Sequence, residues 1–189
     1  MANKVEFGIS NLYVGTYTVA ADGTVTMGTP LAIPGAVSFA PEENAEKSDF
    51  YADNGIYYAG YSSGSFEGDL EVALFPEEFK KQFLGYVELD NGGLATVKNA
   101  IKPQAYIMFQ VEGDVESARA LFYNASFGAI NREYNTIEES KEPNTETISV
   151  TVVGDNKTGI SKVTFVPSDA AYATLFTAPP APALPTESE

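Results

Sequence analysis

The sequence predicts a mainly β fold, an antiparallel β-sandwich or barrel with one short α-helix. Many short runs are rich in Val, Ile, Phe, Tyr and Thr, and turn signals such as ADG, DNGG, EGD and GDNKTG separate them. One segment, PEEFKKQFLG, has a helical pattern instead. The predicted strands cover residues 5–9, 12–19, 31–39, 66–75, 105–111, 118–127, 147–153 and 162–166.

The predicted strand 66–75, FEGDLEVALF, alternates between apolar and acidic side chains. Because neighbouring side chains of a strand point to opposite faces, one face is apolar and the other acidic. We expect the core face to hold Phe66, Leu70, Val72 and Leu74. The opposite face then holds Glu67, Asp69 and Glu71. Gly68 adds no side chain to the core face, so it predicts a bend or a bulge.

The predicted helix follows this strand directly. Pro76 suits the first helical turn, and Gly85 is a typical helix stop. Phe79 and Phe83 lie one turn apart on a single face. We expect the helix to cover an open end of the β core; the same pair of Phe side chains could instead dock a partner subunit.

Two segments do not have the pattern of a core. Residues 41–65 form a long connection, since most loops in compact domains have about 4–6 residues. It carries aromatic side chains suited to an interface arm or a folded excursion. These are Phe50, Tyr51, Tyr57, Tyr58 and Tyr61. Residues 178–189 are Pro-rich and end in acids, which predicts a flexible tail after one domain at residues 1–177.

Composition excludes several classes of function. The 189 residues include 26 acids and 11 bases, and the formal net charge of −15 repels nucleic acid and anionic membranes. The absence of Cys and His removes disulfides, the ligands of most zinc sites and the commonest general base. The first residues, MANKVEFGIS, lack the apolar region of a secretory signal, and no run approaches the about 20 apolar residues of a membrane span. We expect a soluble protein made in a cytoplasm.

No pattern of residues indicates catalysis. Glu42–Glu43 and Glu138–Glu139 could in principle supply a glycosidase pair, but adjacent acids in turn-like segments are typical of solvated surface. The turns DNGG and GDNKTG offer oxygen ligands for Ca²⁺ without the full EF-hand spacing, so turn chemistry explains them better. No phosphate-binding loop, dinucleotide fingerprint or nucleophile elbow is present. We expect no catalytic residue, no cofactor, no metal site and no enzymatic activity.

Six segments together resemble the major tail protein (tail tube protein) family of long-tailed siphophages of Gram-positive bacteria. They are IPGAVSFAPE (33–42), DFYADN (49–54), GDLEVALFPEEFKKQFLG (68–85), KPQAYIMFQ (102–110), ALFYNASF (120–127) and EPNTETISV (142–150). They occur in the family's order and spread from about residue 5 to residue 153, whereas residues 154–189 match less clearly.

The resemblance implies the phage tail tube fold, a β-sandwich or half-barrel with one short flanking α-helix, and a structural role in the virion. Subunits of the family form hexameric rings that stack into a tube for genome ejection, and their inner sheets join into one closed barrel. The implied partners are further copies of the chain and the tape measure, distal tail and tail terminator proteins. DNA passes through without specific binding, and no membrane insertion is expected. Residues 41–65 would then reach a neighbouring subunit.

The resemblance also offers a purpose for the acidic face. Glu67, Asp69 and Glu71 would line the lumen, where an acidic wall does not hold DNA by counterion release. A solvated outer face, or an edge strand charged against aggregation, is the alternative for the same three residues. The alternative function is a carbohydrate- or receptor-binding β-sandwich whose tyrosines in 41–65 stack on sugar rings. A carboxylate glycosidase is a third, weaker hypothesis.

Overall fold

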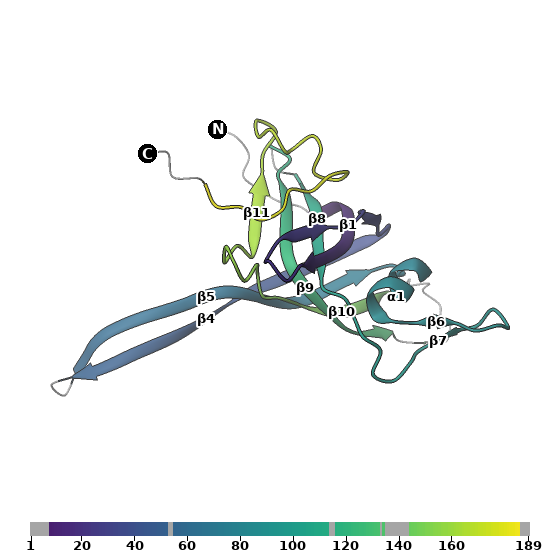
Figure 1. The fold of residues 1–189 in the computed structure, drawn as a ribbon, viewed down its shortest axis with the longest axis horizontal. Coiled ribbons are helices and arrows are strands. Elements are labelled where there is room, and N and C mark those ends of the chain that lie inside the picture. The colour runs from purple at the N-terminus through teal and green to yellow at the C-terminus, as the bar shows by residue number, and fades with distance from the viewer. Residues whose placement is uncertain (1–7, 53–54, 114–115, 133, 135–143, 186–189) are drawn as a thin grey trace, which may run out of the picture.

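The computed structural model describes residues 8–52, 55–113, 116–132, 134 and 144–185. Its strands are β1 (Gly8–Val19), β2 (Val25–Met27), β3 (Leu31–Ala32), β4 (Ala36–Ala52), β5 (Gly55–Val72), β6 (Val87–Glu88), β7 (Leu94–Ala95), β8 (Ala105–Glu112), β9 (Arg119–Arg132), β10 (Glu146–Val152) and β11 (Lys162–Phe165). The helix α1 (Glu77–Leu84) connects β5 to β6 (Figure 1). This confirms the predicted mainly β, antiparallel fold with one short helix. Within the described residues, no helix is long and apolar enough to cross a membrane.

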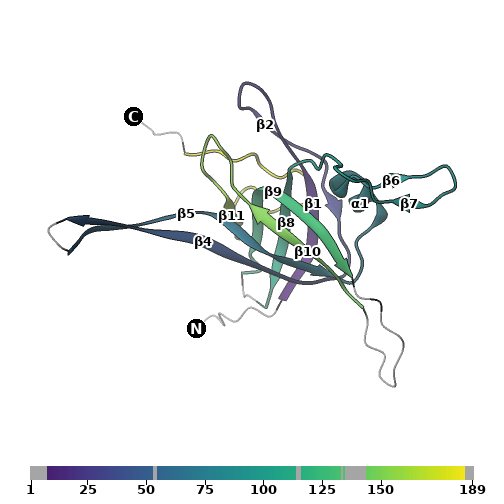
Figure 2. The same ribbon diagram turned by 90° about the horizontal axis from the view of Figure 1, so that it is seen from below.

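Nine of the strands form one sheet, in which β2, β1, β8, β9, β10, β5 and β4 lie side by side in that order. β3 pairs with β1, β11 pairs with β9, and β6 and β7 form a separate hairpin. The sheet is open, because among the described strands β2 and β4 end it and no closed barrel forms. Its twist lays β4, β5 and β10 across β1, β8 and β9 (Figure 1, Figure 2).

The main hydrophobic core lies between these two parts of the sheet. Most of its buried side chains come from β1, β5, β8, β9, β10 and α1. Phe39 of β4 reaches over this core, with ring centroids 5.8 Å from Phe109 and 5.5 Å from Phe122. Edge-to-face contacts of this kind add to the hydrophobic burial of each ring. The aromatic contacts therefore tie β4 to β8 and β9, although these strands are not hydrogen-bonded to it.

A second core covers the opposite face of β1, β8 and β9. It contains Tyr17, Tyr106, Met108, Leu121, Tyr123 and Leu175. The chain after β11 lies over it, and Arg119 stacks on the rings of Tyr172 and Phe176 at 4.0 and 4.3 Å from their centroids. The central strands are thus buried on both faces.

The C-terminal segment, which the sequence predicts to be a flexible tail, contacts the second core over part of its described length. Tyr123 donates a hydrogen bond of 2.9 Å from its hydroxyl to the carbonyl of Pro180, and Pro182 is buried. Because a Pro-rich chain has apolar rings and unpaired carbonyls, it can cover an aromatic surface without forming a strand. Residues 186–189 lie outside the described residues.

The segment 41–65 is a long β-hairpin instead of an irregular connection. β4 and β5 pair from Ala36 and Val72 out to Ala52 and Gly55, and the hairpin extends well beyond the body of the molecule (Figure 1). The register shifts between Asn44 and Glu46, where the hairpin leaves the core. Beyond that point neither face has a core to cover, so the sequence shows no alternation of apolar and polar residues there.

Two local expectations also need correction. Leu74 does not face the core: it lies beyond the end of β5 with 52% of its surface exposed, and Phe75 is buried at 1% instead. The bend after Val72 changes which side chains point inward. Gly68 marks no bulge, since it pairs in register with Pro41. The backbones of β4 and β5 instead approach each other closely at Gly68, because a Cβ there would lie 2.1 Å from the carbonyl oxygen of Ala40.

Candidate assembly surfaces

The side chains of β5 that point away from the core form part of a polar face, which extends over four strands. The register places Glu67 between Glu42 and Thr151, Asp69 between Ala40 and Ser149, and Glu71 between Ser38 and Thr147. Residues directly opposite each other share a face of the sheet, and β9 continues this face with Ser126 and Asn131. We call these eleven residues the polar face. None of them is Lys or Arg.

The three acids predicted to line a lumen lie together on this face. Glu67 and Asp69 are exposed, and Glu71 is half-buried. The Glu71 carboxylate accepts hydrogen bonds from the hydroxyls of Thr145, at 2.6 Å, and Ser38, at 3.3 Å. Residues two apart on a strand are about 6.7 Å apart, so neighbouring carboxylates repel each other by only about 0.6 kcal/mol in water. The fold can therefore keep three acids in line at low cost.

The five aromatic residues predicted as interface anchors have their backbones in the β4–β5 hairpin. Phe50 pairs with Tyr58, and Tyr61 pairs with Lys47. Tyr58 has 66% of its surface exposed. The side chains of Phe50, Tyr51, Tyr57 and Tyr61 lie outside the described residues.

The helix α1 closes one end of the main core with the two predicted Phe residues. Phe79 and Phe83 are both fully buried, with ring centroids 5.3 Å apart. Phe127 of β9 contacts both, at 5.1 and 5.9 Å, and Phe75 stacks on Phe79 at 4.7 Å. The helix ends at Gly85, whose φ of 69° is in the left-handed region that glycine adopts readily. The pair thus packs on the subunit's own sheet.

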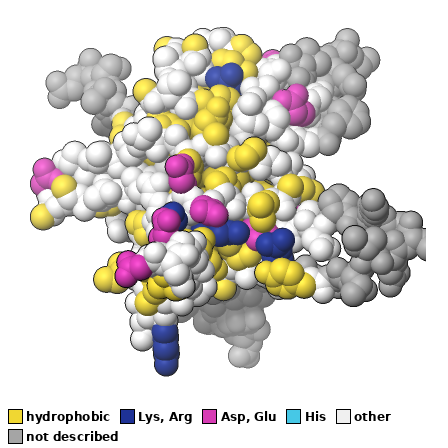
Figure 3. Space-filling model, turned by 90° about the vertical axis from the view of Figure 1, so that its right-hand side faces the viewer, with side chains coloured by type: hydrophobic (Ala, Val, Ile, Leu, Met, Phe, Trp, Pro, Cys, Tyr) yellow, Lys and Arg dark blue, Asp and Glu magenta, His cyan; other side chains and the backbone are white. Residues whose placement is uncertain are grey.

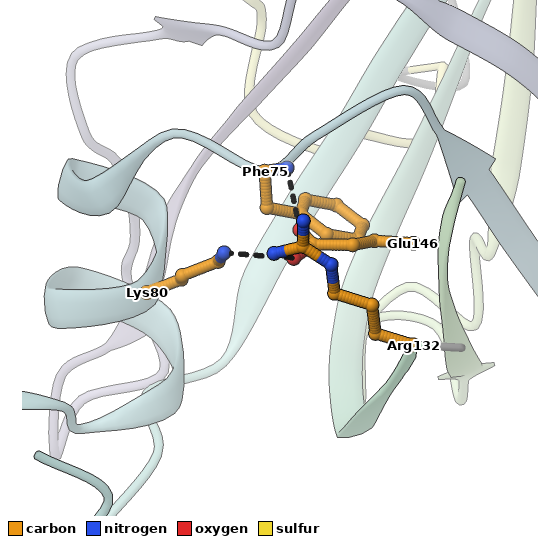
Figure 4. Close-up of polar contacts among 4 residues, drawn as sticks. All are labelled: Phe75, Lys80, Arg132 and Glu146. Carbon is orange, nitrogen blue, oxygen red and sulfur yellow. Dashed lines mark hydrogen bonds and ion pairs between the residues drawn. The ribbon is translucent and has the colours of Figure 1, made fainter. Parts of the chain in front are cut away.

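A buried ionic cluster fixes α1 to the sheet, and sequence analysis missed it. The Glu146 carboxylate lies 3.0 Å from Lys80 Nζ and 3.3 Å from Arg132 Nη1 through Oε1 (Figure 4). Its Oε2 accepts a hydrogen bond of 2.8 Å from the backbone N–H of Phe75. Glu146 is 2% exposed and shares the core face of β10 with Ile148. The sequence contains a signal for this cluster, because Glu146 occupies the same alternating set of positions as the apolar Ile148. A carboxylate that is buried among apolar side chains needs cationic partners.

Figure 3 shows the end of the molecule that carries α1. Apolar side chains lie there in small groups between acids and Lys or Arg side chains. Lys81 pairs with Glu88 on this surface at 2.5 Å, with the two side chains 35% and 61% exposed. The surface is thus mixed, in contrast to the polar face.

The paired acids considered for glycoside hydrolysis do not form a site. Glu42 and Glu43 are neighbours within β4, so their side chains point to opposite faces. Glu138 and Glu139 lie outside the described residues. The described part of the chain contains no cluster of acids that could hold a metal ion.

In the described structure, two long strand edges beside the polar face have no partner strand. β4 ends the sheet, so its side away from β5 is open. β9 pairs with β8 only as far as Ala125, whereas its pairing with β10 continues to Arg132. The second half of β9 is therefore open on the side away from β10. These edges lie on the two sides of the unit β4–β5–β10–β9, whose outer surface is the polar face.

Comparison with known proteins assigns the family. A family model described as "Phage tail tube protein" matches residues 2–155. Among solved structures, the chain resembles a protein of the anti-feeding prophage cap, the "AFP tube terminating cap", with 12% identity and a TM-score of 0.48 over 88% of this chain and 96% of that one. It also resembles a chain of the sheath–tube complex of the extracellular contractile injection system PVC in its extended state, with 13% identity and a TM-score of 0.48 over 86% and 94%.

No protein among those with curated descriptions matches the sequence. The family model nevertheless spans most of the chain, including α1 and every strand that contributes to the polar face. Membership of a tail tube family gives the chain a structural role in the tail of a virion and not an enzymatic one. The protein belongs to the phage tail tube protein family.

Proposed function

We propose that this protein assembles into hexameric rings that stack as the tail tube, the conduit through which genome DNA is ejected into the host. The observation that carries the proposal is an open sheet with two unpaired edges on either side of a polar face that has no Lys or Arg. Unpaired edges are templates for pairing with another chain. A ring of subunits satisfies them without leaving free ends.

In the proposed ring, β4 of one subunit pairs with the open half of β9 of the next. Each subunit then contributes β4, β5, β10 and β9 to one continuous inner barrel, and the polar faces line its lumen. The main core lies on the other side of these strands. This arrangement makes Glu67, Asp69 and Glu71 lumen residues.

An acidic lumen favours the passage of DNA. Duplex DNA carries about one negative charge per 1.7 Å of axis, so a wall with Lys and Arg would bind it by releasing counterions. The subunit has a formal net charge of −15, and its polar face offers carboxylates, hydroxyls and amides. With a Debye length of about 8 Å at physiological salt, the repulsion acts near the wall and keeps the duplex away from it.

The β4–β5 hairpin suits contacts between subunits or rings. β4 has 17 residues, which at about 3.3 Å per residue gives a strand of about 55 Å, longer than the core needs. The part beyond Asn44 projects from the body and includes the five aromatic residues. We propose that it docks on a neighbouring copy, and that the tape measure, distal tail and tail terminator proteins complete the tail during assembly in the host cytoplasm.

Electron microscopy of the concentrated protein tests the assembly. Rings or tubes are expected, with Glu67, Asp69 and Glu71 on the inside of the reconstructed wall. Tubes with these carboxylates on the outside would refute the lumen assignment. Dispersed monomers that bind glycans would refute the tube and support a carbohydrate-binding module.

The role of the acids is tested by changing Glu67, Asp69 and Glu71 to Lys together. The variant is expected to form tubes that retain DNA, with the salt dependence of binding steeper by about one unit of slope per phosphate contact. A matched control changes three exposed acids elsewhere, Glu78, Asp90 and Glu116, to Lys. Equal DNA release by phage carrying either set would show that the polar face has no special part in passage.

A further inference from the structure

The open edge of β9 has a definite cause in the sequence. β8 and β9 pair up to Ala105 and Ala125, and the residue that would continue β8 outward is next to Pro103. Proline has no N–H to donate to a ladder. The carbonyl of Gln104 instead accepts a hydrogen bond of 2.8 Å from the N–H of Tyr17 on the other side. The chain before β8 therefore leaves the side of β9 away from β10 unpaired from Ser126 onward.

A single side chain caps this open edge. Lys102 donates hydrogen bonds from Nζ to the carbonyl of Phe127, at 3.2 Å, and to the carbonyl of Gly128. These two carbonyls lie where a partner strand would otherwise bind. The Lys102 side chain is exposed, so the chain around it does not hold it there by burial.

A groove runs beside the capped edge. Its volume is about 260 Å³, and its walls come from the end of α1, the segment 96–102 and the edge of β9. The lining includes Leu84, Tyr86, Val97, Ala100 and Ile130. Lys102 and Gly128, whose carbonyl it caps, both line this groove. The edge of β9 therefore has backbone groups that no strand pairs with, and there is space beside them.

We propose that Lys102 is a removable guard of the β9 edge, and that β4 of a second copy of this chain displaces it during assembly. This inference rests on the proposed ring and adds its regulation: the guard keeps free subunits from pairing before assembly begins. A Lys at an open strand edge is a common protection against uncontrolled pairing. Once β4 takes the two carbonyls, the ammonium group must leave them.

The charge of β4 favours it as the strand that binds the open edge of β9. β4 is the other described strand with a long open edge, and it carries exposed acids on both faces, at Glu42 and Glu43. One of these carboxylates can pair with the Lys102 ammonium group once that group has left the edge. An exposed ion pair of this kind contributes little to affinity. It favours the correct partner and register instead. In a Lys102 variant, the loss of the hydrogen bonds to the β9 edge should therefore change the onset of assembly more than the loss of this ion pair.

The test compares Lys102→Met with two controls in light-scattering assays of spontaneous assembly, with tubes verified by electron microscopy. Removing the guard's hydrogen bonds should lower the protein concentration at which assembly begins by about two- to tenfold. Lys102→Arg keeps the donors and should assemble like the wild type. Lys98→Met removes the same charge from the same exposed segment and should also assemble like the wild type. Equal onset for Lys102→Met and Lys98→Met, or a later onset for Lys102→Met, would overturn the proposal.

A second measurement retains Lys102 and so does not depend on the folding of that variant. Because the chain has no Cys, Ala129→Cys can be combined with a single Cys at each position from 37 to 44 of β4 in turn. Oxidised tubes should give a ladder of linked subunits for at least one combination, which requires β4 on the guarded edge. Wild-type tubes without any ladder would refute this inference and the β4–β9 pairing of the proposed ring, but not the assembly of the protein into a tube. A wild type that forms neither rings nor tubes would refute the proposed function itself.

Discussion

The change Glu146→Gln tests whether the buried ionic cluster fixes α1 to the sheet. The substitution keeps the size of the side chain but removes its charge, which leaves the Lys80 ammonium, 14% exposed, without an anionic partner. Breaking a buried ion pair from one side costs about 3–5 kcal/mol. Arg132 is 38% exposed and can be rehydrated, so we expect the lower end, about 3 kcal/mol. For a chain of this size that lowers the melting temperature by about 6–12 °C, measured by calorimetry on the free subunit.

The matched control is Glu88→Gln. Glu88 pairs with Lys81, the next lysine of α1, but on the surface, so its loss should leave the melting temperature close to that of the wild type. The double change Lys80→Met and Glu146→Gln should cost less than the sum of the single changes, since no buried cation remains unpaired. Equal melting temperatures for Glu146→Gln and the wild type would refute the role of the cluster.

Three further changes have definite expected results. Phe79→Ala removes a fully buried ring and should cost about 3–5 kcal/mol in denaturant unfolding, whereas Leu74→Ala should cost far less because Leu74 is 52% exposed; equal costs would contradict the packing described for α1. Burial opposes ionisation of Asp155, but hydrogen bonds from Tyr17, Thr158 and the N–H of Lys157 together hold its pKa below the usual value. Its contribution to stability is therefore present above the unfolded pKa of about 3.9 and is lost as the pH falls through the lower folded value, so Asp155→Asn should reduce the dependence of stability on pH in acid; an unchanged acid profile would contradict this. Replacing residues 47–61, between the paired Glu46 and Ser62, by an Asn-Gly turn should leave a folded subunit that makes no long tubes, and normal tubes would show that the hairpin is dispensable.

The parts of the fold that the sequence predicts well are those with a core on one side only. The alternation of Leu70 and Val72 with Asp69 and Glu71 is the pattern of a strand between a core and solvent, and the structure has that strand. The helix was predictable because Phe79 and Phe83 repeat at one turn between a Pro and a Gly. Both patterns arise because the core covers only one face of the strand and one face of the helix.

The prediction failed where a residue's surroundings depend on distant parts of the chain. Leu74 continues the alternation in the sequence, but the bend after β5 turns it outward, and a bend leaves no period-two signal. Glu146 has the spacing of a core residue, but its neutralising partners come from α1 and β9, at Lys80 and Arg132. Pairing across such separations is a property of the fold and not of a local pattern.

The β4–β5 hairpin was missed for a different reason, which bears on its role. Beyond Asn44 the two strands project from the body and have no layer of their own chain to cover. No core therefore requires apolar and polar residues to alternate there, and the polar sequence with its Gly and Ser residues resembles that of a loop. An isolated two-stranded hairpin is at best marginally stable in water. A hairpin of this length, with a Tyr at position 58 that is 66% exposed, therefore gains most from a surface outside its own subunit. The same reasoning applies to the guarded edge of β9, because each feature is incomplete within one chain. In the proposed ring, a second copy supplies what is missing from both.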